Sequence, residues 1–151
     1  MDMLSKDGKA EAVQRCTRHF NENYNCCETV LLSFSEILGV ECDVIPKIST
    51  PFGGGIHKRQ HMCGALSGAV MAIGLKYGRS TPDGDRETSD KKAGRVIDKF
   101  IEKYGGANCL EVLGYGPEDL ERIKQNKQQI RANICGPLIK QVAEWLWEEL
   151  E

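Results

Sequence analysis

FGGGIHKRQHMCGALSGAVMAIGLKY, residues 52–77, is the stretch that decides the fold of this chain. It begins with three glycines, and no charged residue lies between His61 and Lys76. Its apolar residues recur at the i, i+3, i+7 spacing of one helical face, namely Cys63, Leu66, Val70, Ile73 and Tyr77. The pattern predicts a buried helix with Cys63 in its first turn. A membrane span is disfavoured, because roughly 20 apolar residues are needed and this run is shorter.

Small residues line a second face of the same predicted helix, where Gly64, Gly68 and Ala72 follow one another at steps of four. Glycine inside a helix costs about 0.5–1 kcal/mol relative to alanine, so something must offset that cost. A glycine seam permits close approach, either of another helix backbone or of a bulky non-protein group. The sequence leaves both open.

The composition favours one domain, 1–151, without a nucleic-acid or membrane partner. The length of 151 residues suits a single core, and the net charge of −2 gives no basic footprint. The N-terminal residues lack the apolar segment of a secretory signal, so we expect a cytoplasmic protein. In that reducing compartment, seven cysteines are not expected to form a disulfide framework.

Helical patterns surround the central stretch, and no alternating strand pattern occurs. Asn25 followed by Glu28 resembles a capping box, and Gly39 suits the end of that helix. An apolar periodicity from Ala93 to Tyr104 stops at two glycines, and the terminal helix is expected after Cys135. We therefore predict an all-α, single compact helical domain of about six or seven helices around a buried glycine-rich central helix.

Four cysteines share one predicted setting, at or just before a helix N-terminus: Cys26, Cys63, Cys109 and Cys135. A helix start offers free N–H groups and the positive end of the dipole, which favour thiolate over thiol. Thiolate both binds metals and attacks disulfides, so the setting suits either chemistry. No C-x-x-C occurs, which excludes a thioredoxin motif and the haem-attachment motif. Taken alone, these spacings are also compatible with scattered structural thiols.

Several motifs resemble those of the C-GCAxxG-C-C family, whose members are described as redox-active. They are N-Y-N-C-C-E, F-G-G-G-I, M-C-G-A-L-S-G-A-V-M-A-I-G-L-K-Y-G, and the single cysteines 109 and 135. The resemblance runs from about Val13 to the terminal helix. It implies that the four signature cysteines are Cys26, Cys63, Cys109 and Cys135, with Cys16, Cys27 and Cys42 as extras. Here the glycine follows the central cysteine, as Gly64, and either Cys26 or its neighbour Cys27 could be the first signature position.

Related domains occur in split-Soret cytochromes, and this relation implies an iron–sulfur cluster on the cysteines. Haem is not implied. The first hypothesis is therefore an electron-transfer or redox protein with an iron–sulfur cluster bound by three or four of these cysteines, beside Gly64 and Gly68. If the protein is an enzyme, we expect an oxidoreductase, and neither its substrate nor its redox partner is identified.

Three alternatives remain. A thiol–disulfide oxidoreductase would cycle a defined pair, for example Cys63 with Cys26. A structural zinc site would use four thiolates as a tetrahedron. A helical interaction protein would carry inert cysteines.

Two further features give minor predictions. His57 and His61 precede Cys63 and could supply a nitrogen ligand. Trp145 and Trp147 are about 200° apart on a helical wheel. We expect that they cannot both face one core, which predicts a homodimer with one of them at the contact.

Overall fold

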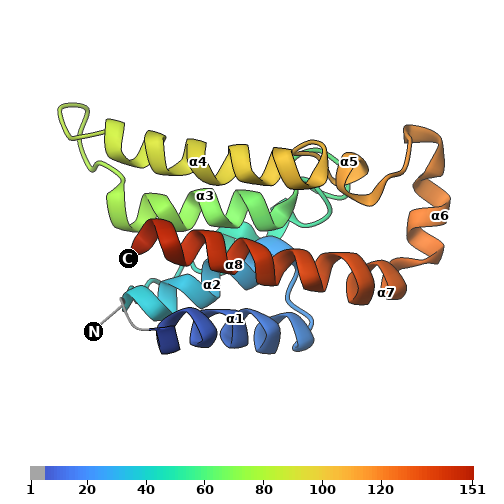
Figure 1. Cartoon of the computed structure of the whole chain (residues 1–151), viewed down its shortest axis with the longest axis horizontal. Coiled ribbons are helices and arrows are strands. Elements are labelled where there is room, and N and C mark those ends of the chain that lie inside the picture. The colour runs from blue at the N-terminus through green and yellow to red at the C-terminus, as the bar shows by residue number, and fades with distance from the viewer. Residues whose placement is uncertain (1–5) are drawn as a thin grey trace.

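Helices make up the fold of residues 6–151, the part of the chain that this computed structural model describes (Figure 1). The α-helices are α1 Lys6–Asn21, α2 Cys26–Leu38, α3 Gly64–Tyr77, α4 Glu87–Tyr104, α5 Cys109–Leu113, α6 Leu120–Gln125, α7 Lys127–Ile130 and α8 Gly136–Leu150. Short 3₁₀ segments are η1 Lys47–Phe52 and η2 Pro117–Asp119, and Arg131–Cys135 is a π-helical turn. Among the described residues no strand forms, so the predicted all-α class is confirmed.

Helix α3 is the central element, as the sequence predicts. It packs against α2, α4 and α8, and α1 in turn packs against α2 and α8 (Figure 1). Every residue from Cys63 to Ala69 is buried, so the first half of α3 has no solvent-facing side. The uncharged stretch is thus explained by burial on all sides, since a charge there would lose its hydration.

The glycine seam of α3 is filled by the backbone of α2. A Cβ added at Gly64 would lie 3.1 Å from the Cys27 nitrogen, and one at Gly68 would lie 2.9 Å from the Cys27 oxygen. Of the two kinds of close approach expected, the structure therefore shows that of a second helix. Gly74, in the same helix, faces open space.

The ends of α2 and α4 are as the sequence predicts. Asn25 Oδ1 accepts from the Glu28 amide at 2.9 Å, and Glu28 Oε1 accepts from the Asn25 amide at 3.0 Å, which completes a capping box. Gly39 and Gly105 end the two helices in the left-handed region, with φ of 70° and 82°. The capping box holds the entry of α2, and so of Cys26, in place.

Helix α8 begins at Gly136, directly after Cys135, as the sequence predicts, but this helix start is not free. Ile130, Arg131, Cys135 and Gly136 all have right-handed helical dihedrals, so the backbone runs on from α7 through the π turn into α8. The wider π turn interrupts the i→i−4 hydrogen bonds at the place where Pro137 would otherwise remove one.

The two tryptophans of α8 do not support a homodimer. They point in different directions, but α8 lies between α1 and α4, so each has a helix of the same chain to pack against. Trp147 is buried and its ring packs over Gly8 of α1. Trp145 meets the ring of Tyr104 on α4, with centroids 6.3 Å apart. Both side chains thus have partners within the chain, and a homodimer stays a prediction without this support.

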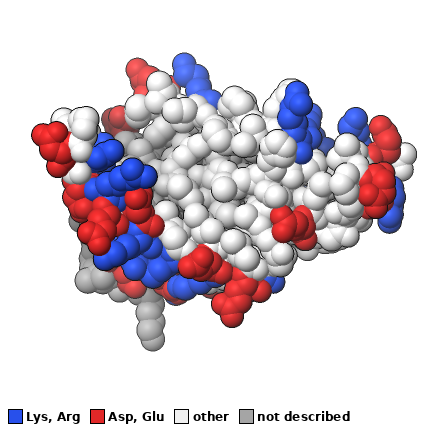
Figure 2. Space-filling view, turned by 90° about the horizontal axis from the view of Figure 1, so that it is seen from above, with Lys and Arg blue, Asp and Glu red and all other residues white. Residues whose placement is uncertain are grey.

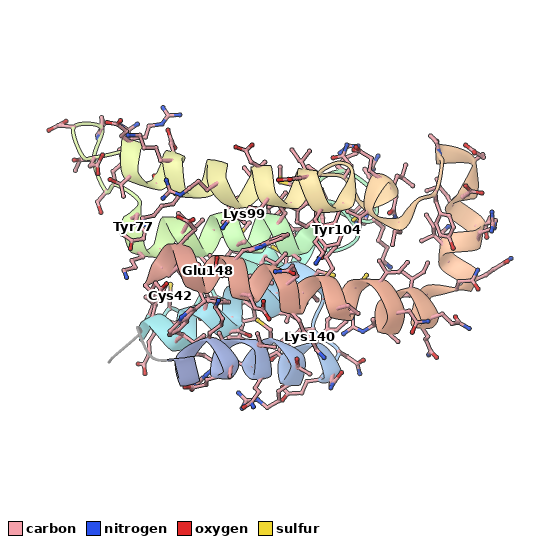
Figure 3. All side chains as sticks on the ribbon, viewed as in Figure 1. Cys42, Tyr77, Lys99, Tyr104, Lys140 and Glu148 are labelled. Carbon is pink, nitrogen blue, oxygen red and sulfur yellow. The ribbon has the colours of Figure 1, made fainter. Side chains whose placement is uncertain are left out.

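Charged side chains tie the outer helices to α8. Glu148 accepts from Lys9 of α1 at 2.8 Å and from Lys99 of α4 at 3.4 Å, and Figure 3 shows Lys99 and Glu148 in this region. On the face shown in Figure 2, cations and carboxylates are mixed near both ends, with a broad uncharged area between them. No helix within residues 6–151 has the length and apolar character that crossing a membrane requires.

One part of the molecule extends beyond the bundle. We call residues 109–126, which contain α5, η2 and α6, the arm; Figure 1 shows α6 at the far right end. None of these three elements contains a buried residue, and Leu120 is 45% exposed. The arm starts at Cys109, and α7 leads back from it to Cys135.

Candidate functional site

The four signature cysteines come from four separate elements. Cys26 is the first residue of α2, Cys63 is the N-cap residue of α3, and Cys109 is the first residue of α5. These three placements match the sequence prediction. Cys135 directly precedes α8, as predicted, but it also closes the π turn, so it does not stand at a free helix start. Tyr104, labelled in Figure 3, marks the end of α4 from which the chain continues to Cys109.

A short backbone pairing brings Cys63 and Cys109 together. Met62 and Asn108 form an isolated antiparallel bridge. On either side of it, the Cys63 amide donates to the Ala107 carbonyl at 2.8 Å, and the Cys109 amide donates to the His61 carbonyl at 2.8 Å. The segment before α3 is thereby fixed against the segment before α5, and two helix starts lie side by side.

The thiols of this pair are joined by a hydrogen bond. A hydrogen bond from Cys109 lowers the pKa of Cys63, and the amides of Ala65 and Leu66 in the first turn of α3 lower it further. The same hydrogen bond raises the pKa of Cys109, and burial adds to that rise. Cys63 is therefore the more acidic thiol of the pair, and the N-terminus of α3 favours its thiolate form as the sequence argument expected.

Cys26 and Cys135 form the second pair. Their hydrogen bond raises the pKa of Cys26 well above its usual value and lowers the pKa of Cys135. The positive charge of Arg131 adds to the lowering at Cys135. The charge of Cys63 acts on Cys26, Cys109 and Cys135, so the two pairs interact as one group of four, which we call the thiol cluster.

The three remaining cysteines are in different settings. Burial raises the pKa of Cys16 to about 12 and that of Cys27 to about 12. The backbone of Cys27 lies against α3, and no hydrogen bond with a described residue is recorded for its thiol. The thiol of its neighbour Cys26 is hydrogen-bonded to Cys135. Cys42 is exposed in the loop after α2. The thiol cluster thus contains Cys26 rather than Cys27.

The polypeptide entering the site has an unusual backbone. Five consecutive residues, 54–58, have positive φ between 52° and 73°, and three of them are not glycine. Amide–carbonyl bonds across this left-handed turn hold it, including Gln60 to Gly54 at 3.0 Å and His61 to Gly55 at 2.9 Å. Each non-glycine residue there costs about 1–2 kcal/mol. The turn fixes the position of His61, whose carbonyl anchors Cys109.

The two histidines that the sequence singled out are both exposed. What the structure shows for His61 is the backbone bond to Cys109. Two neighbours of the cluster were missed by the sequence reasoning: Arg131, whose charge acts on Cys135, and Tyr104, whose pKa is raised by burial and by the charge of Cys63. For Arg131 a signal existed, since it lies four residues before Cys135 in a helical segment.

The four thiols of the cluster differ in their fit to zinc and to an iron–sulfur cluster. Thiolates around one tetrahedral zinc ion stand roughly 3.8 Å apart, given Zn–S bonds of about 2.3 Å. Among the described residues, no group of three or more histidine, cysteine or acidic side chains is placed to hold a single ion. The thiol cluster offers instead two hydrogen-bonded pairs, each with one thiol of lowered pKa, and amide donors to Cys63 and Cys109. Cysteine thiolates with N–H donors to their sulfurs are the ligands of iron–sulfur clusters.

Comparison with known proteins gives one family and one relative. The family model described as "Putative redox-active protein (C_GCAxxG_C_C)" matches residues 24–149. An "Uncharacterized protein" of Archaeoglobus fulgidus is 28% identical over 110 residues, which cover 66% of this chain and 72% of the relative. No solved structure was found to match the chain.

Proposed function

This chain belongs to the C_GCAxxG_C_C family of redox-active proteins, and we propose that it transfers electrons through an iron–sulfur cluster held by Cys26, Cys63, Cys109 and Cys135. The observation that carries the proposal is the meeting of four thiols from four elements in one interacting group. The pKa values of two of the four, Cys63 and Cys135, are lowered, which favours formation of the thiolate that ligates iron.

The surroundings of the cluster support the same proposal. Amides of Gly64, Ala65 and Leu66 donate towards Cys63 and Cys109, and such donors stabilise negative charge on sulfur. A Cβ added at Gly64 would lie 3.2 Å from the Cβ of Cys26, so a larger residue there would push two of the ligand-bearing helices apart. A bound cluster would supply one-electron chemistry, and the chain's residues hold its ligands, screen them from water and set their charge.

Metal analysis tests this proposal. Protein purified without oxygen should contain iron and acid-labile sulfide and should show a sulfur-to-iron charge-transfer absorption band that bleaches on reduction. Changing any one of Cys26, Cys63, Cys109 or Cys135 to serine should lower the iron and sulfide content by more than half. Cys27→Ser is the matched control, because it alters the neighbouring position and should keep the cluster. If the wild-type chain binds no iron after anaerobic reconstitution, the proposal fails.

Thiol–disulfide exchange is a second candidate, favoured by the hydrogen bonds within the two thiol pairs. In such a reaction Cys63 Sγ would attack a substrate disulfide, and the mixed disulfide would be resolved by Cys109. Two electrons and two protons pass to the substrate, which leaves as a dithiol, and Cys63–Cys109 remains as a disulfide. The pairing differs from the Cys63–Cys26 example expected from sequence.

Peptide mapping separates the two candidates. After mild oxidation with a disulfide compound, this second function predicts Cys63–Cys109 and Cys26–Cys135 as the products. Mixed pairing among all seven cysteines would contradict it. A structural zinc site would be recognised by zinc that survives purification and by unfolding when a chelator removes it.

A further inference from the structure

Two cations near Cys135, Arg131 and Lys140, have no carboxylate partner among residues 6–151. Other cations of the described residues do have one, for example Arg15 with Glu11 at 2.8 Å and Lys124 with Glu121 at 3.8 Å. The positive charge of Arg131 and Lys140 is therefore not neutralised by an ion pair within the described chain.

These two cations line a cleft between the end of α1 and the start of α8. It measures about 480 Å³, within the ~300–1,000 Å³ range of small-molecule sites. Its wall also contains the amide side chains of Asn21, Asn23 and Gln128, for which the structure records no side-chain hydrogen bond. No aspartate or glutamate lines the cleft. The lining is therefore cationic and rich in unused hydrogen-bond donors.

Arg131 is held rigidly in the wall. Its Nη2 donates to the backbone carbonyls of Phe20 and Tyr24, the latter at 2.8 Å. Its guanidinium lies 3.6 Å from the centre of the Phe20 ring. The Nε and Nη1 donors have no recorded partner among the described residues. A guanidinium fixed in this way loses little further freedom when it binds an oxyanion.

We infer that this cleft binds a small organic anion carrying phosphate or carboxylate groups. Arg131 and Lys140 supply the charge, and the amides of Asn21, Asn23 and Gln128 supply the remaining donors. The inference does not depend on what the thiol cluster holds. Because Arg131 begins the π turn that Cys135 closes, a bound anion would nevertheless lie next to the proposed redox site.

Calorimetric titration of the full chain with sodium phosphate and with sodium citrate, at low ionic strength, tests this inference. We expect saturable binding of at least one anion, weakening as sodium chloride is added. The better ligand identifies which oxyanion chemistry the cleft prefers. Absence of saturable binding for both would overturn the inference.

Lysine variants locate the binding. Lys140→Gln should weaken binding by about tenfold and Lys140→Glu by more, since a charge-assisted hydrogen bond is lost and then replaced by repulsion. Lys140 is exposed and has no recorded partner, so the circular dichroism spectrum should not change. The matched control is Lys124→Gln on α6, outside the cleft. Equal affinity in wild type and Lys140→Gln, or equal weakening in Lys124→Gln, would overturn the inference.

Discussion

At the residue scale, Gly68 leaves no space for a methyl group between α3 and α2. An added Cβ would lie 2.9 Å from the Cys27 carbonyl oxygen and 3.0 Å from Val30 Cβ, and a backbone atom cannot move aside as a flexible side chain can. We predict that Gly68→Ala lowers the free energy of unfolding by about 1–3 kcal/mol. Urea denaturation followed by circular dichroism measures it.

Gly74→Ala is the matched control for this prediction. Gly74 lies in the same helix with nothing near its added Cβ, so alanine should stabilise α3 by about 0.5–1 kcal/mol. Destabilisation of both variants to the same extent would contradict the packing role of the seam.

Two of the three thiols outside the cluster, Cys16 and Cys42, should differ sharply in reactivity. Burial raises the pKa of Cys16 to about 12, so at pH 8 almost none of it is thiolate, and its sulfur is inaccessible as well. Cys42 is exposed. We predict that iodoacetamide labels Cys42 of the folded protein well before Cys16, as peptide mass spectrometry over time would show. If Cys16 and Cys42 are labelled at the same rate in the absence of denaturant, the burial of Cys16 is contradicted.

At the element scale, the left-handed turn before Cys63 stores backbone strain. Lys58 has φ of 60°, a conformation that costs a non-glycine residue about 1–2 kcal/mol. Glycine removes that cost but loses more entropy on folding, so Lys58→Gly should raise the free energy of unfolding by up to about 1 kcal/mol. Thermal unfolding of the variant measures the change.

The neighbouring position provides the control. Arg59 is not among the residues with positive φ, so Arg59→Gly gains no relief and should lower stability by roughly 0.5–1 kcal/mol. If Arg59→Gly stabilises the protein as much as Lys58→Gly does, the gain does not come from the left-handed backbone.

Helix ends and buried faces that depend on neighbouring residues could be predicted from the sequence. Features that depend on contacts between distant parts of the chain could not. The capping box at Asn25, the stop at Gly105 and the burial of α3 follow from neighbouring residues and periodicity. The π turn at Cys135 depends on how α7 and α8 join, and Pro137 by itself favours a helix start.

The site shows the same division. That Cys63 and Cys109 begin helices could be predicted from local sequence. That they meet depends on the bridge between Met62 and Asn108, two residues far apart in the chain with no recognisable pairing motif. The choice of Cys26 over Cys27 likewise depends on which side of α2 faces α3, because the seam at Gly64 takes the backbone of Cys27.

At the scale of the whole molecule, Glu148 joins three helices. Hydrogen bonds and charges of Lys9 and Lys99 hold the pKa of its carboxyl below the usual range. A carboxyl whose pKa is lower in the folded state stabilises the protein above its unfolded pKa, and that contribution disappears as the pH falls through the folded value. The effect is therefore present at pH 7 and lost below about pH 4.

Glu148→Gln should accordingly lower stability at pH 7 by a few tenths to about 1 kcal/mol, since the pairs are partly exposed. At pH 3 wild type and variant should be nearly equal. Urea titrations at both pH values measure the difference. Asp98→Asn, on the exposed side of α4, is the control and should change little at either pH; a gap between Glu148→Gln and wild type that persists at pH 3 would contradict the charge-based origin.

The arm has a consequence for chain topology. Cys109 stands where it leaves the bundle, and Cys135 stands where α7 has brought the chain back, with no buried residue in α5, η2 or α6 between them. A group bonded to both cysteines would therefore close residues 109–135 into a covalent ring, although α5, η2 and α6 contribute no buried residue to the core. Such a ring removes loop-closure entropy from the unfolded chain, which stabilises the folded state by about 3.5 kcal/mol for a loop of this length in the chain-entropy description. The folded structure of the arm would then depend on a cross-link between Cys109 and Cys135, formed either by a metal group or by a disulfide.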